Sequence, residues 1–156
     1  MIKIRRGTKS DAPIILNLIK ELAHYENALD KVTVSLEDLE EDGFNKNPLF
    51  WTILAEIKSE VVGMAFYYIR YSTWDGKIFY LEDFVVKESF RRLGIGTLLF
   101  EECVRVTKKI NANGMAWQVL NWNQPAINFY KKYNAELKND WTNGKLHKKQ
   151  INKLII

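Results

Sequence analysis

The 156-residue chain is long enough for one domain with a sizeable core, and its 47% apolar and 27% charged residues are typical of a globular protein rather than a disordered one. Its net charge of +4 comes from scattered lysines without an aromatic–basic RNA motif, so we expect no nucleic-acid binding. Since no apolar run has the length of a membrane span and His24 and His147 lack metal-ligand spacing, we expect neither a membrane segment nor a metal site.

The single cysteine, Cys103, excludes an intrachain disulfide and fits a reducing compartment. The first six residues alternate like a β-strand, and no signal-peptide pattern precedes them. We therefore expect a cytoplasmic protein.

The first half of the chain predicts strands and helices in succession. After a strand over residues 1–6, apolar residues recur at helical spacing and predict a helix over residues 11–26. An acidic segment predicts a short helix over residues 35–42 that stops at Gly43. Three strands follow, the first two joined by a tight turn and the third apolar enough to be buried on both faces, over residues 50–57, 61–71 and 77–86.

The second half continues with a helix that carries Cys103 on its apolar stripe, where we expect the thiol to be part of the core. A strand over residues 115–120 and a helix over residues 125–133 come next. Trp141 and the segment 145–154 predict a final hairpin. Antiparallel strands with helices between them favour a layered, mixed α/β fold. Without linkers or repeats, we expect a single domain over residues 1–156.

The stretch from Tyr80 to Thr97 is the most informative part of the sequence. An apolar strand with two acids leads into a loop with two arginines and two spaced glycines, and an amphipathic helix follows. Glycines let a backbone approach a ligand closely, and a helix start offers unpaired N–H groups and the positive end of a dipole. Arg91 and Arg92 add cationic forks. The pattern favours polyphosphate capture over a plain turn, and it lacks the third glycine of a dinucleotide fingerprint.

The two acids, Glu82 and Asp83, are adjacent on the predicted strand. Because successive strand residues face opposite sides, both reach one pocket only if the strand bulges. A carboxylate would bind an ammonium group and accept its proton, directly or through a water, because an alkylamine with a pKa of about 10 is mostly protonated at neutral pH. The alternative is that one acid is only a solvated or salt-bridged side chain.

The order Arg-x-x-Gly-x-Gly after a strand resembles the acetyl-CoA pyrophosphate loop of the GNAT N-acetyltransferases. The similarity extends from about Ile4 to about Trp141 and is greatest to the diamine (spermidine/spermine) and thialysine acetyltransferase branch. Five blocks carry it in order, namely residues 18–26, 41–44, 80–84, 94–96 and 122–130. The resemblance implies the GNAT fold, a splayed, mostly antiparallel mixed sheet flanked by helices, with a bulge at Glu82–Asp83 and an opening between residues 80–86 and 115–120.

The resemblance also implies direct transfer of an acetyl group from acetyl-CoA to a primary amine in a ternary complex. The backbone of the glycine loop would hold the pyrophosphate, and the preceding strand would pair with the pantetheine arm and offer an N–H to the oxyanion. The cofactor residues implied in this way are Phe84, Val85, Val86, Arg91, Arg92, Leu93, Gly94, Ile95, Gly96, Thr97, Asn123 and Tyr130. Asn123 serves equally well as a helix cap.

Two catalytic residues are implied: Glu82 takes the amine proton, and Tyr130 protonates the departing thiolate. A thiol pKa of about 8.5 makes a phenol a suitable acid for that step. The amine pocket would be lined by Tyr25, Glu26, Ser72, Trp74, Glu82, Asp83 and Trp141, although Tyr25, Trp74 and Trp141 taken singly are more often structural than functional. Relatives pair near the amine site, so we expect a homodimer.

One position departs from the polyamine-acetylating relatives, which tend to carry an acid two residues before the tryptophan of the 71–76 loop. Here Ser72 occupies that position, as in the thialysine-acetylating branch. A polyamine has a second cation to pair, whereas an amino acid has a carboxylate that an acid would repel, so Ser72 favours a thialysine-like amine. Asp75 keeps the polyamine alternative open. A third interpretation is a non-catalytic acetyl-CoA-binding regulatory module. The presence of Glu82 and Tyr130, the two residues implied to be catalytic, speaks against it.

Overall fold

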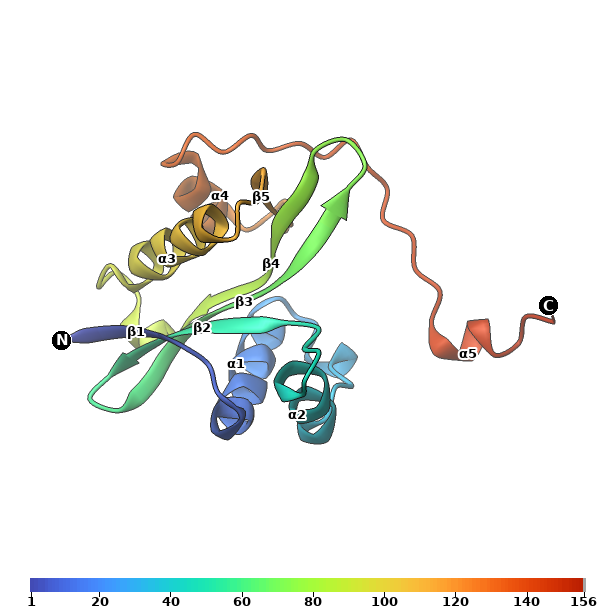
Figure 1. Ribbon diagram of the computed structural model, residues 1–156, viewed down its shortest axis with the longest axis horizontal. Helices are drawn as coiled ribbons and strands as arrows, with labels where there is room; N and C mark the ends of the chain where they lie inside the picture. Colours follow the sequence, from blue (N-terminus) through green and yellow to red (C-terminus); the bar gives the residue numbers. More distant parts are fainter. Residues whose placement is uncertain (156) are drawn as a thin grey trace. The chain divides into compact units, whose positions relative to one another are not determined.

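A five-stranded sheet organises the first of two units into which the chain divides, Met1–Gln118 and Val119–Ile156. The computed structural model describes residues 1–155, and each unit is considered by itself (Figure 1). The strands follow one another across the sheet in chain order, and the first four are antiparallel neighbours. They are β1 Ile2–Arg6, β2 Trp51–Ile57, β3 Glu60–Ser72, β4 Gly76–Val86 and β5 Gly114–Trp117.

Three helices cover the two faces of this sheet. Helices α1 (Ala12–Tyr25) and α2 (Leu36–Phe44) lie on one face, and α3 (Ile95–Lys109) lies on the other (Figure 1). The predicted mixed α/β fold, with a mostly antiparallel sheet flanked by helices, is therefore confirmed.

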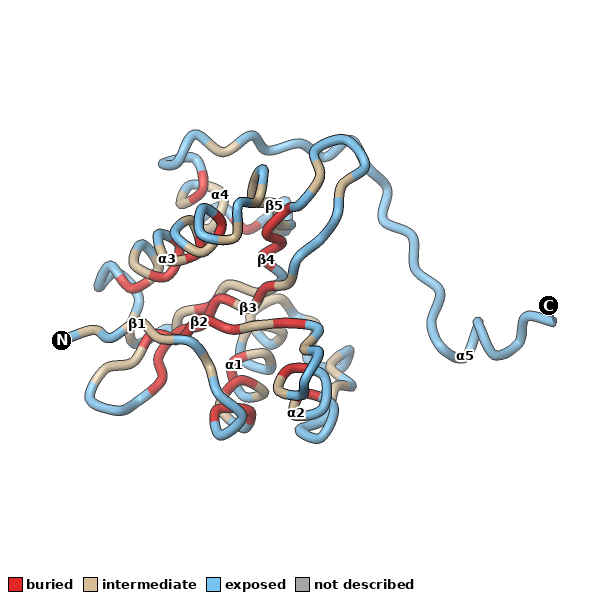
Figure 2. The backbone as a smooth tube through the Cα atoms, viewed as in Figure 1, coloured by how far each residue is buried: buried red, intermediate tan, exposed pale blue. Residues whose placement is uncertain are grey.

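The core forms where the apolar helix stripes meet the strand centres, and Figure 2 shows the buried positions concentrated there. Ile15 and Leu18 of α1 are fully buried against Leu54 and Met64 of the sheet. Burial of one such side chain contributes roughly 1.5–3 kcal/mol, so this layer fixes α1 on its face. On the opposite face, Cys103 of α3 is fully buried, as expected.

Gly43 lies inside the last turn of α2 and does not end the helix, contrary to expectation. A Cβ atom at Gly43 would lie only 2.2 Å from Cζ of Phe50, so the glycine makes room for that ring. Ser35 is the N-cap of the helix, and its Oγ accepts a hydrogen bond from the N–H of Asp38 at 3.0 Å.

The last pair of strands is parallel and short. Ile78 to Leu81 of β4 pair with Gly114 to Trp117 of β5, and all four β4 residues are buried, as expected for a strand covered on both faces. Beyond Leu81, β4 continues to Val86 while β5 has ended, three residues before its predicted end. Among the described strands, β4 therefore has β3 as its only neighbour over residues 82–86.

The second unit contains helix α4 (Gln124–Lys131) and a single-turn helix, α5 (Lys148–Ile151). The predicted C-terminal hairpin is wrong, because no strand is described after β5 in residues 118–155. The segment is rich in lysine and asparagine and largely exposed, so a hairpin would have little apolar face to bury. An isolated two-stranded hairpin is marginal in water.

No helix in residues 1–155 combines the length and the apolar character needed to span a membrane.

Candidate active site

The bulge expected at the paired acids is present in β4. Asp83 pairs with Phe66 of β3, and Leu81 pairs with the next residue, Tyr67, so Glu82 is an extra residue in the strand. An extra residue breaks the alternation of side chains. Glu82 and Asp83 therefore need not point to opposite faces of the sheet.

Asp83 lies in an environment that favours its neutral form. Burial raises its pKa to about 7, and the nearby carboxylates of Glu82 and Glu26 add to this shift. No cation within residues 1–155 forms an ion pair or hydrogen bond with Asp83. A carboxyl group with a pKa near neutrality changes its charge under ordinary conditions and suits general acid–base work.

Tyr68 and Tyr80 stand beside Glu82 on the same part of the sheet. They are partners in the β3–β4 register, and their ring centroids are 5.1 Å apart. Burial raises the pKa of both phenols, and the charge of Glu82 raises it further. The exposed Glu82 carboxylate thus has aromatic neighbours, an arrangement that attracts ammonium groups.

The end of α1 adds the predicted pair Tyr25 and Glu26. Burial raises the pKa of Glu26, the C-terminal cap of α1, and its charge acts on Asp83. The guanidinium carbon of Arg91 lies 5.0 Å from the Tyr25 ring centroid, and Arg91 Nε donates to the Val86 carbonyl at 3.1 Å. The structure thus brings the end of α1, the acids of β4 and the start of the glycine loop together.

The glycine loop enters α3 through a left-handed residue. Gly94 is the N-cap of α3 with φ 79°, a conformation that side-chain-bearing residues rarely adopt. A Cβ there would meet no atom within 4 Å, so the backbone at this point faces open space. Arg92 also has a positive φ, 64°, and is exposed. Unpaired N–H groups at the first turn of α3 therefore lie beside cations, as anion binding requires.

The edge of β4 beside this loop has outward-pointing backbone groups. The Lys87 N–H donates to the Val62 carbonyl of β3 at 2.9 Å, whereas the Val86 carbonyl accepts from Arg91. Backbone groups alternate in direction along an antiparallel strand. Val86 and Phe84 therefore direct their N–H groups away from β3, while Val85 is buried.

Ser72 stabilises the turn between β3 and β4. Its Oγ accepts hydrogen bonds from the N–H groups of Trp74 and Asp75, at 3.2 and 3.1 Å, and donates to the Asp75 carboxylate at 3.2 Å. Trp74 is 84% exposed at the tip. Asp75, which could replace the missing acid, is thus partly occupied within the turn.

Three predicted residues belong to the second unit and are placed only within it. Asn123 caps α4, since its Oδ1 accepts from the Ala126 N–H at 3.3 Å. Tyr130 is buried in the last turn of α4, with its ring 5.5 Å from that of Phe129. Trp141 is 78% exposed in an irregular segment.

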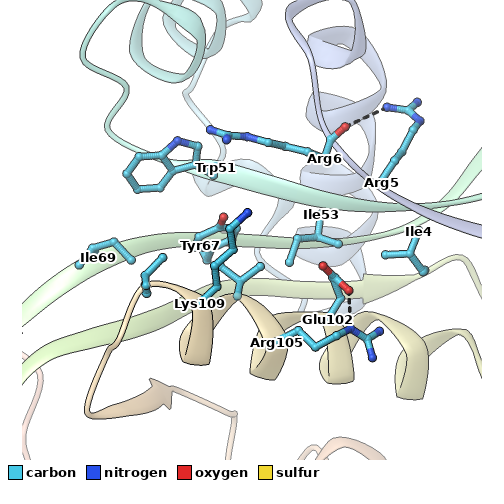
Figure 3. Close-up of a pocket in the computed structure, with 12 residues that line it drawn as sticks. Ile4, Arg5, Arg6, Trp51, Ile53, Tyr67, Ile69, Glu102, Arg105 and Lys109 are labelled. Atoms are coloured by element: carbon cyan, nitrogen blue, oxygen red, sulfur yellow. Dashed lines mark hydrogen bonds and ion pairs between the residues drawn. The ribbon is translucent and has the colours of Figure 1, made fainter.

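A separate groove of about 530 Å³ lies on the α3 face of the sheet (Figure 3). Its walls combine aromatic and aliphatic side chains with several charged ones, among them Trp51, Tyr67, Arg6 and Lys109. None of the predicted site residues lines it.

Sequence reasoning missed Tyr68, Tyr80 and Arg70 as neighbours of the acids. The guanidinium carbon of Arg70 lies 5.0 Å from the centroid of the Tyr80 ring. The alternation of Phe66, Tyr68, Arg70 and Ser72 along one strand face was the available signal. It could not be used without the β3–β4 register.

Comparison with known proteins gives a consistent result. Residues 16–135 match the Acetyltransferase (GNAT) family. A spermidine/spermine N(1)-acetyltransferase-like protein 1 from Homo sapiens is 40% identical over 140 residues, which are 85% of this chain but only 20% of that protein. A thialysine N-epsilon-acetyltransferase from Bos taurus is 38% identical over 143 residues, covering 86% of this chain and 84% of that protein.

Solved structures show the same fold. An aminoglycoside acetyltransferase from an uncultured soil metagenomic sample, in complex with trehalose, superposes with a TM-score of 0.79 over 94% of this chain and 97% of that chain, at 21% identity. At that identity the likeness concerns the fold alone.

Proposed function

We propose, from the premise that this chain belongs to the GNAT family of acetyltransferases, that it transfers the acetyl group of acetyl-CoA to the primary amine of a small molecule. The observation that carries the proposal is the continuity of β4. One strand holds the cation-free acids Glu82 and Asp83, then an open backbone edge, and then leads to the glycine loop at the start of α3.

Acetyl-CoA would lie along the second half of this path. The loop from Arg91 to Thr97 offers N–H groups and cationic side chains to the pyrophosphate. The outward N–H groups of Phe84 and Val86 suit an extended amide-containing arm, which would add to the sheet like a further strand. One of them would also donate to the thioester oxygen as it becomes an oxyanion.

The reaction is a direct attack in a ternary complex. The amine nitrogen attacks the thioester carbonyl carbon, a C–N bond forms, and the C–S bond breaks. Glu82 binds the ammonium among the tyrosines, and the amine proton passes to Glu82 or to Asp83, directly or through a water. Asp83, with its pKa near neutrality, is the better matched base, and Glu82 is the more exposed ligand.

Tyr130 is proposed to protonate the departing thiolate. This role rests on the family resemblance, and it is supported by the match of a phenol to a thiolate leaving group. Asn123 supports the same region by capping the helix that carries Tyr130.

The substrate is proposed to be a thialysine-like amino acid rather than a polyamine. Ser72 stands where an acid would pair a second cation, and its hydroxyl is engaged in the turn with Asp75. The similarity to the thialysine N-epsilon-acetyltransferase extends over most of the length of both proteins, which supports this choice. The polyamine alternative remains because another relative carries the spermidine/spermine name.

We further propose a cytoplasmic homodimer. The buried, unbridged Cys103 fits a reducing compartment. The exposed Trp74 and Trp141 are suited to a contact between subunits. Sedimentation at micromolar concentration checks the dimer, and a species of only 18.3 kDa would refute it.

Thiol release from acetyl-CoA with a panel of amines tests the proposed activity. We expect release that depends on both substrates, with N-acetylated thialysine identified by mass spectrometry. Binding of acetyl-CoA without release for any amine would instead support the non-catalytic module.

A further inference from the structure

A line of four side chains crosses β3 and β4 on one face of the sheet: Glu82, Tyr68, Tyr80 and Arg70. We call it the β3–β4 row. Tyr68 and Tyr80 are register partners, and Arg70 lies two residues beyond Tyr68, so it projects from the same face of β3. Tyr68 also packs on the core beneath α1 and α2, which identifies the face.

Arg70 lies at the end of the row opposite to Glu82. Its guanidinium stacks over the Tyr80 ring, 5.0 Å from the centroid. The side chain is exposed, and no carboxylate in residues 1–155 lies within ion-pair distance of it. Both Glu82 and Arg70 act on the Tyr68 and Tyr80 phenols, the acid raising and the arginine lowering their pKa, so both charges lie close to the two rings.

We propose that Arg70 binds the carboxylate of the amine substrate and so selects an ω-amino acid over a diamine. The inference rests on the proposed function and names the substrate class of that same site. A guanidinium held over an aromatic ring presents a forked donor that matches a carboxylate.

The order of the groups along the row agrees with such a ligand. Tyr68 and Tyr80 are register partners, Arg70 lies two residues beyond Tyr68 on β3, and Glu82 lies two residues beyond Tyr80 on the antiparallel strand β4. The cation and the acid therefore lie at opposite ends of the row, with the two rings between them. The ammonium would then meet Glu82 while the carboxylate meets Arg70, with the apolar chain over the tyrosines.

Arg70 also opposes the alternative substrate. A diamine in the same pose would place its second ammonium against the guanidinium, and two like charges repel. Ser72, two residues further along β3, removes a competing acid from the same strand face. Arg70 and Ser72 therefore favour a carboxylate at the same end of the substrate.

The test compares thialysine with its decarboxylated analogue, bis(2-aminoethyl) sulfide, which has the same chain and reacting amine. Thiol release gives kcat/KM for each with the wild-type protein, Arg70→Gln, Arg70→Lys and the control Arg105→Gln, whose site on α3 is remote from the row. We expect the wild type to prefer thialysine. Arg70→Gln should lower kcat/KM for thialysine about fivefold to thirtyfold. For the analogue, kcat/KM should stay the same or rise by up to a few-fold, because the repulsion of its second ammonium is removed.

Arg70→Lys should recover part of the preference, because it restores the charge but not the fork, and Arg105→Gln should change neither value. If Arg70 had only a structural role, Arg70→Gln would lower kcat/KM equally for both substrates, and that result would overturn the inference. Equal or greater activity of the wild type on the analogue would also overturn it, although the proposed function would stand. No release with either amine would refute the proposed function and the inference with it.

Discussion

The β1 edge and the β4 end of the sheet hold their acidic side chains in opposite ways. At β1, Arg5 donates to both carboxylate oxygens of Asp11 at 2.8 Å and to Glu56 at 2.7 Å. The hydrogen bonds from this guanidinium hold the pKa of Asp11 well below its usual range. At β4, Asp83 has other carboxylates as its charged neighbours, and its pKa is raised to about 7.

The difference shows how the same residue type serves two purposes. An acid paired with a guanidinium stays ionised and fastens the start of the fold, whereas an acid without a cation has unused affinity for one. Arg91 is engaged elsewhere, because it contacts the Val86 carbonyl and the Tyr25 ring, and Arg70 stacks over the Tyr80 ring. Within the described residues neither arginine forms an ion pair with the acids of β4, which leaves the carboxylates available to a cationic substrate and the glycine loop available to an anionic cofactor.

Loss of an acid at β4 should affect catalysis most strongly. Glu82→Gln keeps the size of the side chain but removes both the charge that binds the ammonium and one of the two groups that can accept its proton, so kcat/KM for acetyl transfer should fall by up to about 10²–10⁴-fold, the range of a general acid–base contribution. Steady-state thiol release measures it. The control Glu88→Gln, an exposed acid just beyond β4, should stay within about twofold. A fall in kcat/KM of less than threefold for Glu82→Gln would show that this acid takes no part in catalysis.

Loss of the cation at β1 should affect stability and not chemistry. Arg5→Met removes the guanidinium from two partly buried carboxylates, so that Asp11 keeps only the hydrogen bonds from Thr8 and Glu56 keeps only the longer ion pair with Lys3. The free energy of unfolding at pH 7 should therefore fall by about 2–3 kcal/mol. Urea denaturation measures it, with Arg105→Met, an exposed pair with Glu102, as a control that should cost below about 1 kcal/mol.

The pH dependence of the β1 cluster follows from the lowered pKa of Asp11. Its stabilisation is present above the unfolded-state pKa of about 4 and is lost as the pH falls through the lower folded-state pKa. The gap between wild type and Arg5→Met should therefore narrow in acid. A constant gap from pH 7 to pH 2 would contradict the assignment.

The glycine loop should be sensitive at its left-handed residue. Gly94→Val forces a branched side chain to a φ of 79°, which costs about 1–2 kcal/mol or displaces the loop. Calorimetry should show acetyl-CoA binding weakened roughly tenfold. Gly144→Val, at an exposed glycine with open space and no positive φ, is the matched control. Unchanged affinity in the Gly94 variant would remove the loop from the cofactor site.

The smallest expected effect is a gain in stability. Because the folded-state pKa of Asp83 is raised, the contribution of its protonated carboxyl group to the free energy of unfolding is fully present below about pH 4. This contribution is lost as the pH rises through about 7. Asp83→Asn never ionises, so at pH 8 it should be more stable than the wild type by about 1–2 kcal/mol, with no gain at pH 4. Thermal unfolding at both pH values checks this, with the exposed Asp42→Asn as control. A gain at pH 4 as large as at pH 8 would rule out ionisation as the cause.

Much of the first unit could be predicted because local patterns and tertiary structure agree there. The periodicity of α1, the two-faced burial of β4 and the bulge at Glu82 all followed from the residues or from the family resemblance. Gly43 was misread, because its role depends on Phe50, which approaches only in the folded chain.

The site was predicted less completely, because its charges act across strands. Glu82 and Asp83 are visible in the sequence, but the stacking of Arg70 on Tyr80 depends on register. The prediction of a C-terminal hairpin was wrong for another reason. The segment is rich in lysine and asparagine and lacks alternating apolar residues, so a single tryptophan was too little evidence for a strand.

Whether the cation-free acids of β4 act on the amine is decided by the pH dependence of kcat/KM for acetyl transfer in the wild type and in Asp83→Asn. This parameter reports the ionisation of free enzyme and free amine. We predict that the wild-type profile rises with an inflection near pH 7, below the titration of the amine, and that Asp83→Asn lacks this inflection. An inflection that persists unchanged in Asp83→Asn, or a wild-type profile governed by the amine alone, would contradict the account.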